Sequence, residues 1–399
     1  MSSREQLVDE ILDRGIIVSI LPDKQELRKR LINEKLRFYI GADATFSSLH
    51  LSHAKNYMLL EDFRKLGHEV IVLFGDFTAR IGDPSGKTSA RQQLSREEVM
   101  KNTEDWLRQI KPLMNFTDQE NPAKVMYNHD WLSKLTMEEV VNLASNVTVQ
   151  QMLERDMFQK RIKDEKPIFL HEFLYPIMQG YDSVAMEVDV EMCGTDQIFN
   201  ALVGRTLLKK LKNKDKFVMA VNLMENPVTG ELMSKSRGTG IFLSFSAEEM
   251  YGAIMSQPDE MIKVFLVNNT RMSLSEIESL LKSENPRDAK MKTAWEIVKL
   301  IKGEEEANHA QENFVQKFQK REAPMDLAEI SLGVSEELLM NILKKCLPKK
   351  SGSDLRRLLD QGGVKIGEDV KSDGQEKISI PADGLVLKAG KKDWFKIIG

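Results

Sequence analysis

The chain has 399 residues, and at about 150 residues per domain this length predicts two or three domains. It carries 57 Lys and Arg against 61 Asp and Glu, a net charge of −4, with 41% hydrophobic residues. This balance excludes a disordered chain and a small disulfide-stabilised protein. The two cysteines, Cys193 and Cys346, form no C-x-x-C pair, which excludes a cysteine-based zinc site and indicates free thiols in a reducing compartment. No apolar run is long enough for a membrane helix or a signal peptide, so we expect a cytosolic protein.

The N-terminal part of the chain predicts two helices and then a strand, helix, strand unit. Apolar residues recur at helical spacing over 4–14 and 25–34. A short strand is expected at about 37–41, followed by a long amphipathic helix. The apolar run at 68–76 is typical of a strand buried in a parallel sheet.

Strands and helices continue to alternate up to about residue 222. In chain order the patterns predict a loop, a helix, a mostly helical segment, a strand, a helix and a strand, at 75–91, 95–110, 112–185, 184–190, 196–211 and 217–222. This alternation predicts an α/β fold with a doubly wound, Rossmann-like parallel sheet.

The C-terminal part of the chain changes pattern twice. Helical patterns run from about 246 to 346, where the strand signal disappears. From 351 onward, a helix closed by Gly362 and Gly363 is followed by short strands. Residues 341–399 hold 13 Lys or Arg against 8 Asp or Glu, a basic bias within an acidic chain.

Residues 39–53, YIGADATFSSLHLSH, combine a strand, a loop and the first turn of a helix. His50 and His53 share one face of that turn, where free backbone N–H groups and the helix dipole favour an anion. Thr45 lies in the loop just before. The pattern suits a polyphosphate whose charge rises during reaction, although two surface histidines would show the same spacing.

Residues 75–91, GDFTARIGDPSGKTSAR, invite comparison with a phosphate-binding P-loop. The P-loop spacing G-x-x-x-x-G-K-[ST] needs glycine where this chain has Ile81, so the comparison fails. Asp83 follows a buried strand, at the sheet edge where open α/β proteins bind ligands, and its carboxylate suits an ammonium group. A plain Asp-Pro turn is the alternative.

Two later segments also place polar side chains near a ligand-binding edge. Tyr175 and Gln179 share a helix face and Asp182 lies a further turn along, so the three can line a pocket. The sequence Gly-Thr-Asp-Gln at 194–197 follows a strand and opens a helix, which puts a carboxylate at the ligand edge. A helix cap is the alternative interpretation of those residues.

The segment LMSKSRGTG at 232–240 is rich in Gly and Ser. It carries Lys235 and Arg237, so as a mobile loop it can fold over a phosphate chain. A solvated linker is the alternative.

Taken together and in this order, the segments resemble the tyrosyl branch of the class I aminoacyl-tRNA synthetase family, of the bacterial type, over essentially the whole chain. The resemblance rests on HLSH against the signature HIGH, MSKS at 233–236 against KMSKS, and IGDPSGK, Y-x-x-x-Q-x-x-D and G-[ST]-D-Q. It implies a Rossmann-like catalytic domain, a helical insertion within it, an MSKS loop with a helical anticodon-binding domain, and a small α+β RNA-binding domain, at 1–225, about 110–190, 226–340 and 341–399.

The family reaction activates L-tyrosine with ATP to tyrosyl-adenylate and then transfers tyrosine to tRNA(Tyr). The resemblance therefore implies L-tyrosine, ATP with Mg²⁺ on its phosphates, and tRNA(Tyr) as partners, and a homodimer formed through the inserted region. DNA, a membrane and a protein-bound metal are not expected. Because a carboxylate is already a nucleophile, the first step needs alignment and charge stabilisation rather than a general base.

The resemblance also implies roles for single residues. Tyrosine would be bound by Tyr39, Thr78, Asp83, Tyr175, Gln179, Asp182 and Gln197. Within that set, the phenol would contact Tyr39 and Asp182, and the ammonium group would contact Asp83, Tyr175 and Gln179. ATP would lie against Gly41, Asp43, Thr45, His50, His53, Gly194, Asp196, Lys235 and Ser236. Charge in the reaction would be stabilised by Thr45, His50, His53, Lys87, Arg91 and Lys235.

Two positions depart from the family pattern. Ser52 stands where HIGH has glycine, so we expect shifted adenine packing, and Leu232 replaces the first lysine of KMSKS. The tryptophanyl branch is the nearest alternative, against which Tyr39 with Asp182 favours a phenol over an indole. A synthetase-derived RNA-binding factor without catalysis is the other alternative. The altered signatures favour that factor, and the complete set of phenol and ammonium ligands opposes it.

Overall fold

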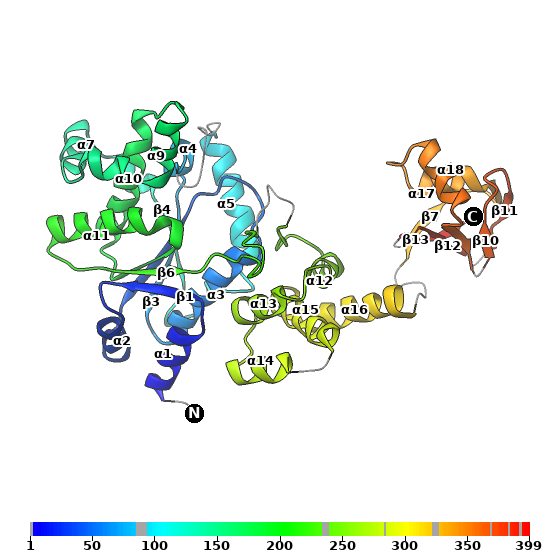
Figure 1. The fold of residues 1–399 in the computed structure, drawn as a ribbon, viewed down its shortest axis with the longest axis horizontal. Coiled ribbons are helices and arrows are strands. Elements are labelled where there is room, and N and C mark those ends of the chain that lie inside the picture. Colours follow the sequence, from blue (N-terminus) through cyan, green and yellow to red (C-terminus); the bar gives the residue numbers. More distant parts are fainter. Residues whose placement is uncertain are drawn as a thin grey trace. The chain divides into compact units, whose positions relative to one another are not determined.

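The computed structural model describes residues 3–84, 94–233, 239–282, 285–320, 327–367, 369–381, 384–390 and 393–399. The chain divides into two compact units, Met1–Glu304 and Glu305–Gly399, which Figure 1 colours from blue to yellow and from yellow to red. Over those ranges, we find no helix with the length and apolar character needed to cross a membrane.

The first unit is built on a six-stranded sheet with the order β1-β6-β5-β2-β3-β4. Its strands are β1 (Ile17–Leu21), β2 (Arg37–Ala42), β3 (Glu69–Phe74), β4 (Lys124–Tyr127), β5 (Val190–Gly194) and β6 (Phe217–Val221). Edge strand β1 is antiparallel to β6, and the other neighbours are parallel. The chain winds outward from β2 in both directions, which confirms the predicted doubly wound sheet.

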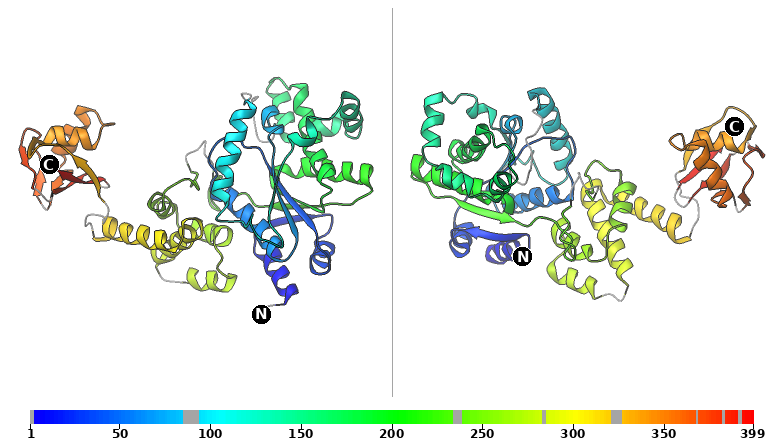
Figure 2. Two further views of the ribbon diagram at one scale, coloured as in Figure 1. Left: turned by 180° about the vertical axis from the view of Figure 1, so that it is seen from behind. Right: turned by 45° about the horizontal axis from the view of Figure 1, so that its top comes forward.

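Helices cover both faces of this sheet. The helices between its strands and beside it are α1 (Arg4–Asp13), α2 (Lys24–Asn33), α3 (Leu51–Lys65), α4 (Thr78–Ile81), α5 (Arg96–Ile110), α6 (His129–Leu132), α7 (Met137–Ala144), α8 (Val149–Leu153), α9 (Asp156–Lys163), α10 (Leu170–Met186), the 3₁₀ turn η1 (Thr195–Gln197) and α11 (Ile198–Lys212). Figures 1 and 2 show α3 and α5 on one side of the strands and α10 and α11 on the other. The helices expected near 95–110 and 196–211 are confirmed.

The strand expected at 184–190 is wrong in position. Helix α10 continues to Met186, and Glu187 ends it in a left-handed conformation, with φ 48°. Val184 and Met186 are buried as part of the helix, so the apolar run that favours a strand belongs to a helix face. Strand β5 begins only at Val190.

After the sheet, the described residues of the first unit form the helices α12 (Ala247–Met255), α13 (Met261–Asn269), α14 (Leu274–Leu281) and α15 (Pro286–Lys302), where the sequence predicts helical structure.

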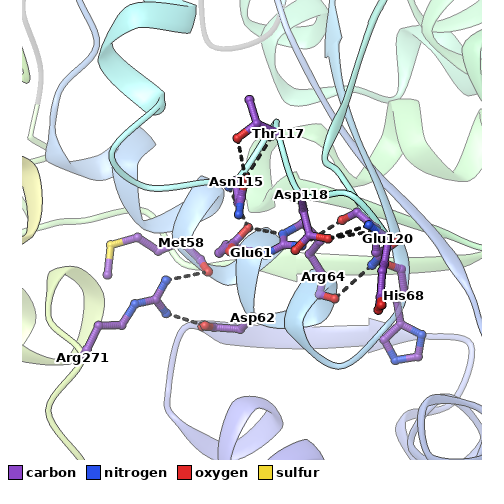
Figure 3. A network of polar contacts seen from close by, with 11 residues as sticks. Met58, Glu61, Asp62, Arg64, His68, Asn115, Thr117, Asp118, Glu120 and Arg271 are labelled. Atoms are coloured by element: carbon purple, nitrogen blue, oxygen red, sulfur yellow. Dashed lines mark hydrogen bonds and ion pairs between the residues drawn. The ribbon is translucent and has the colours of Figure 1, made fainter.

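A network of ion pairs anchors α3 to neighbouring segments (Figure 3). Arg64 and Glu61 form a buried pair within α3, with Nε to Oε2 at 2.7 Å. Arg64 also reaches Asp118 at 2.9 Å, and Asp62 pairs with Arg271 at 2.5 Å. The network therefore holds α3 against the loop before β4 and the segment after α13.

The second unit contains α16 (Glu304–Phe314), whose first residue precedes the unit boundary, and the π-helix η2 (Val315–Lys320). It also contains β7 (Ala328–Ser331), β8 (Glu336–Leu338), α17 (Leu339–Cys346), α18 (Gly352–Asp360), β9 (Val364–Ile366), β10 (Asp369–Lys371), β11 (Lys377–Ser379), β12 (Leu385–Ala389) and β13 (Asp393–Ile398). The strands form a sheet of order β10-β9-β12-β13-β7 and a two-stranded sheet β11-β8.

The expectation of helical structure up to residue 346 is wrong for two short strands. Strand β7 pairs parallel with β13, and β8 pairs antiparallel with β11. Their partners are distant in sequence, so strands this short leave no local signal. The small C-terminal fold thus includes residues ahead of 341. Gly362, with φ 64°, follows α18 where the sequence predicts the end of a helix.

His68 makes the stability of the first unit depend on pH. The side chain is fully buried, its Nδ1 accepts the Leu36 N–H at 3.2 Å, and burial, with the charge of Arg4, lowers its pKa from 6.5 to about 4. In the unfolded chain His68 is protonated below about pH 6.5, whereas in the folded chain it is protonated only below about pH 4. Between these two pH values the unfolded state binds more protons, so the stability of the folded state decreases as the pH falls below 6.5. Between pH 7 and pH 5 we expect a loss of about 2 kcal/mol from this group.

Urea unfolding at both pH values measures that loss. His68→Gln should show a smaller difference in unfolding free energy between pH 7 and pH 5 than the unmodified chain. An equal difference in both proteins would contradict the role of His68.

Candidate active site

A cavity of about 270 Å³ opens at the carboxyl ends of β2, β3 and β5. Its lining brings together most of the residues predicted to bind ligands: Tyr39, Gly41, Asp43, Thr45, His53, Thr78, Asp83, Tyr175, Gln179, Asp182, Gly194 and Gln197. His50 and Asp196 are not part of this lining, although Asp196 is next to Gln197 and His50 lies three residues before His53. Lys87, Arg91, Lys235 and Ser236 lie outside the described residues.

One end of the cavity suits a phenol. Asp182 accepts hydrogen bonds from Trp131 Nε1 at 2.7 Å and from Asn128 Nδ2 at 3.3 Å. Burial raises the pKa of Asp182 well above its usual range, and these two hydrogen bonds oppose that shift. Across the pocket, the hydroxyl of Tyr39 lies 3.2 Å from Ser183 Oγ. Burial, followed by the charges of Glu191 and Asp182, raises the pKa of Tyr39, so its hydroxyl stays protonated.

The other end is rich in acceptors. Tyr175 donates its hydroxyl proton to Asp43 Oδ2 at 2.9 Å, and Thr78 donates to Asp43 Oδ1 at 2.8 Å. Asp43, which the sequence places beside ATP, thus joins two side chains expected to bind tyrosine. Gly75 allows this approach, because a Cβ there would collide with both Asp43 and Thr78. Asp83 accepts from Gln197 Nε2 at 2.7 Å.

The two histidines lie at the start of α3, as predicted. The backbone N–H of His50 donates to His53 Nδ1 at 3.3 Å, and the ring centroids are 4.0 Å apart. Burial, with the charge of Lys55, lowers the pKa of His50 to about 4, and burial lowers that of His53 well below 6.5. Both rings are therefore neutral at pH 7. His50 is only 9% exposed, which excludes the alternative of two surface histidines.

The residues after the MSKS segment run alongside the start of α3. His50 pairs with Phe242 in an isolated β-bridge, and Leu51 N donates to the carbonyl of Ile241 at 3.0 Å. On the other flank, Leu232 forms a bridge with Glu225, and its carbonyl accepts from Thr239 Oγ1 at 3.1 Å. Leu232, in place of a lysine, therefore contacts Glu225 and Thr239, whereas Ile241 and Phe242 contact the histidine turn.

Gly194 lines the cavity, and a Cβ at this position would meet Asp196 Oδ1 at 2.5 Å. Neither η1 nor α11 begins with a side-chain cap hydrogen bond, which opposes the interpretation of these residues as a helix cap. The carboxylate of Asp196 instead accepts a hydrogen bond from Gln197 Nε2 at 3.3 Å.

Several lining or supporting side chains were missed in the sequence, among them Asn128, Trp131, Ser183 and Glu191. Short elements in the mostly helical segment gave no reason to select Asn128 or Trp131. Within the part of the chain that the structure describes, no group of three or more His, Cys, Asp or Glu could hold a metal ion.

The open parallel sheet, the histidine pair at a helix start and the carboxylates across the strand ends define a class I synthetase type of site. Residues 31–319 match the family described as tRNA synthetases class I (W and Y). The chain is 39% identical to the tyrosine–tRNA ligase of Thermotoga maritima over 407 aligned positions, covering 100% of this chain and 98% of the relative. It is also 39% identical to that of Moorella thermoacetica, covering 97% and 94%. The chain therefore belongs to the class I tRNA synthetase family of the tryptophan and tyrosine enzymes.

Solved structures agree on the fold. The C-terminally truncated mitochondrial tyrosyl-tRNA synthetase of Aspergillus nidulans superposes with a TM-score of 0.68 at 23% identity, over 78% of this chain and 94% of that one. The tyrosyl-tRNA synthetase of Archaeoglobus fulgidus, complexed with L-tyrosine, gives a TM-score of 0.58 at 19% identity, over 76% and 99%.

Proposed function

We infer that the chain is a tyrosine–tRNA ligase, which activates L-tyrosine with ATP and transfers it to tRNA(Tyr). The observation that carries this inference is the single cavity with Asp182 and Tyr39 at one end and Asp43, Tyr175 and Gln179 at the other. A zwitterion with a para hydroxyl needs both ends, and an indole offers no hydroxyl for the first. The curated relatives named tyrosine–tRNA ligase support the same activity.

In the first step, a carboxylate oxygen of tyrosine attacks the α-phosphorus of ATP, and the bond to the pyrophosphate oxygen breaks. No proton has to be removed, so the residues contribute alignment and charge stabilisation. Mg²⁺ enters on the phosphates of the nucleotide substrate. His53, which lines the cavity at the start of α3, is proposed to contact the phosphates. In the second step, a terminal ribose hydroxyl of tRNA attacks the carbonyl carbon, and AMP leaves.

ATP–pyrophosphate exchange with a panel of amino acids tests the proposed activity. Tyrosine alone should support rapid exchange. Exchange with tryptophan instead would assign the chain to the tryptophanyl branch, and exchange with no amino acid would favour an RNA-binding factor without catalysis.

We also propose a homodimer formed through the inserted helical region. The support is a set of exposed apolar side chains on α7 and at the start of α10: Met137, Val141, Phe169 and Leu170, exposed by 77%, 56%, 46% and 79%. Apolar surface of this kind is typical of a protein interface.

The second unit is proposed to bind tRNA. Exposed basic side chains lie on its helices, in the last turn of α17 and along α18: Lys344, Lys345, Arg356 and Arg357. Lysine and arginine side chains bind the phosphates of nucleic acids, and we propose that these four bind the tRNA backbone. We propose that the protein acts in the cytoplasm.

Truncation after residue 320 removes both sheets of the second unit. A cut at 340 would instead leave β7 and β8 behind without their partner strands. The shortened chain should retain ATP–pyrophosphate exchange and lose most aminoacylation. Its tRNA binding should also depend less steeply on salt. Unchanged charging of tRNA would contradict the proposed role of this unit.

A further inference from the structure

A buried ion pair beneath the cavity has no part in the roles assigned so far. Lys216 Nζ contacts the carboxylate of Glu191 and donates to Ser183 Oγ at 2.8 Å. Lys216 and Glu191 are 0% and 1% exposed. Gly204 makes room for the ammonium group, because a Cβ there would lie 2.7 Å from Lys216 Nζ. The pair is thus enclosed on all sides by α10, α11, β5 and β6.

A chain of amide groups links Glu191 to the ligand side of the cavity. Gln179 Nε2 donates to Glu191 Oε1 at 3.1 Å, and Gln179 Oε1 accepts from Asn200 Nδ2 at 2.9 Å. Asn200 Nδ2 also donates to Gln197 Oε1 at 2.8 Å. Gln197 Nε2 then donates to Asp83 at 2.7 Å. The chain therefore ends in a carboxylate on either side.

The two carboxylates determine which way every amide in the chain faces. A carboxylate can only accept hydrogen bonds, so Gln179 must turn its NH₂ group toward Glu191 and Gln197 must turn its NH₂ group toward Asp83. Both glutamine carbonyl oxygens then face Asn200, whose NH₂ group has one hydrogen for each. A carbonyl oxygen has a second lone pair, and Gln179 lines the cavity.

We propose that Glu191, neutralised by Lys216, is a positioning residue that orients Gln179 so that its carbonyl oxygen is offered to the α-ammonium group of the bound amino acid. The inference rests on the proposed tyrosine pocket and deepens it. An ammonium group only donates hydrogen bonds, so a Gln179 turned the other way would meet it with N–H groups. Glu191 itself need not touch the ligand.

The lysine serves the carboxylate rather than the ligand. An unpaired charge is costly to bury, and the contact with Lys216 Nζ gives the Glu191 carboxylate a partner. As one half of this ion pair, Glu191 faces Gln179 with an acceptor oxygen. Asp43, Asp83 and Asp182 are the other acidic groups that line the same cavity, and all three already accept hydrogen bonds from neutral side chains.

Glu191→Gln in the full-length chain tests the proposal, because an amide at 191 can either donate or accept. Two ligands that differ only in the ammonium group are compared by calorimetry: L-tyrosine and 3-(4-hydroxyphenyl)propanoate. We expect the affinity for L-tyrosine to fall by about 10- to 100-fold, while that for the propanoate stays within about twofold. In exchange assays, KM for tyrosine should rise with little change in kcat.

Two controls exclude a merely structural effect. Tyr39→Phe, at the phenol end, should weaken both ligands equally. In Glu191→Gln alone, the charge of Lys216 is left buried without a partner, and this variant could fail to fold for that reason. The double variant Glu191→Gln with Lys216→Met removes both charges and therefore tests the proposal in a neutral core. Its affinity for L-tyrosine should remain low.

Equal losses for both ligands in Glu191→Gln, no loss at all, or recovered tyrosine binding in the double variant would each overturn the proposal. Failure of the unmodified chain to bind L-tyrosine would instead overturn the proposed function, so the two failures are distinguishable.

Discussion

Replacing His53 by alanine is expected to lower kcat for ATP–pyrophosphate exchange by about 10²- to 10³-fold, with the Kd for tyrosine unchanged within about twofold. His53 lines the cavity at the start of α3, and its Nδ1 accepts the backbone N–H of His50. The proton of the neutral ring must therefore be on Nε2, which can donate to a phosphate oxygen as charge builds there. Stopped-flow measurement of adenylate formation and equilibrium binding of tyrosine separate the two quantities.

The variant His53→Gln is the matched control for this expectation, because it retains an N–H donor on a side chain of similar reach. It should recover part of the lost rate. Since burial holds the pKa of His53 well below 6.5, the rate in the unmodified chain should show no titration of this ring between pH 7 and pH 8. A parallel loss of tyrosine affinity in His53→Ala would contradict the assignment of His53 to the phosphates.

Replacing Asp182 by alanine is expected to reduce the preference for tyrosine over phenylalanine, measured as the ratio of kcat/KM values, by about 10- to 100-fold. The buried carboxyl of Asp182 already accepts from Trp131 and Asn128, and the phenol of tyrosine would supply a further donor. Phenylalanine leaves that acceptor without its ligand partner, which is the source of selection. Without Asp182, bound phenylalanine no longer leaves a buried acceptor without a partner, so tyrosine and phenylalanine bind more equally.

Tyr39→Phe provides the comparison for Asp182→Ala. It removes one hydroxyl that contacts Ser183, and we expect a smaller loss of selectivity, of about tenfold. Exchange assays with both amino acids give the ratio for each variant. An unchanged ratio in Asp182→Ala would place the phenol of the substrate elsewhere.

Most helices and the strands β2, β3 and β6 followed from local patterns, whereas the strand predicted at 184–190 overlaps the end of α10. The contiguous apolar residues at 68–76 predict a buried strand, and β3 lies within this run. Helix α3 begins directly after His50, as the spacing of His50 and His53 predicts. The short strands β7 and β8 could not be predicted in this way. Their stability comes from hydrogen bonds to partners far along the chain, so their own few residues hold no distinctive pattern.

In the candidate site, too, some features were predictable from local sequence and others depend on contacts between distant segments. Residue types and spacing alone selected Asp83, Tyr175 and Gln179 as ligand groups, because helical and strand periodicity determine which side chains share a face. No such rule connects Asp43 with Tyr175, which are 132 residues apart and yet hydrogen-bonded. Only the doubly wound topology, which brings the ends of β2 and β5 side by side, makes them neighbours.

The sequence by itself thus determined the chemistry that the pocket can offer and the family of the fold. The tertiary structure alone decided how that chemistry is oriented. Glu191 and Lys216 show the difference, since each is an ordinary charged residue of a strand or loop in the sequence. Lys216, just before β6, pairs with Glu191 of the adjacent strand β5, and the pair presents a buried acceptor to the amide of Gln179. Hydrogen-bond direction depends on which groups meet, and contacts between distant segments exist only in the folded chain.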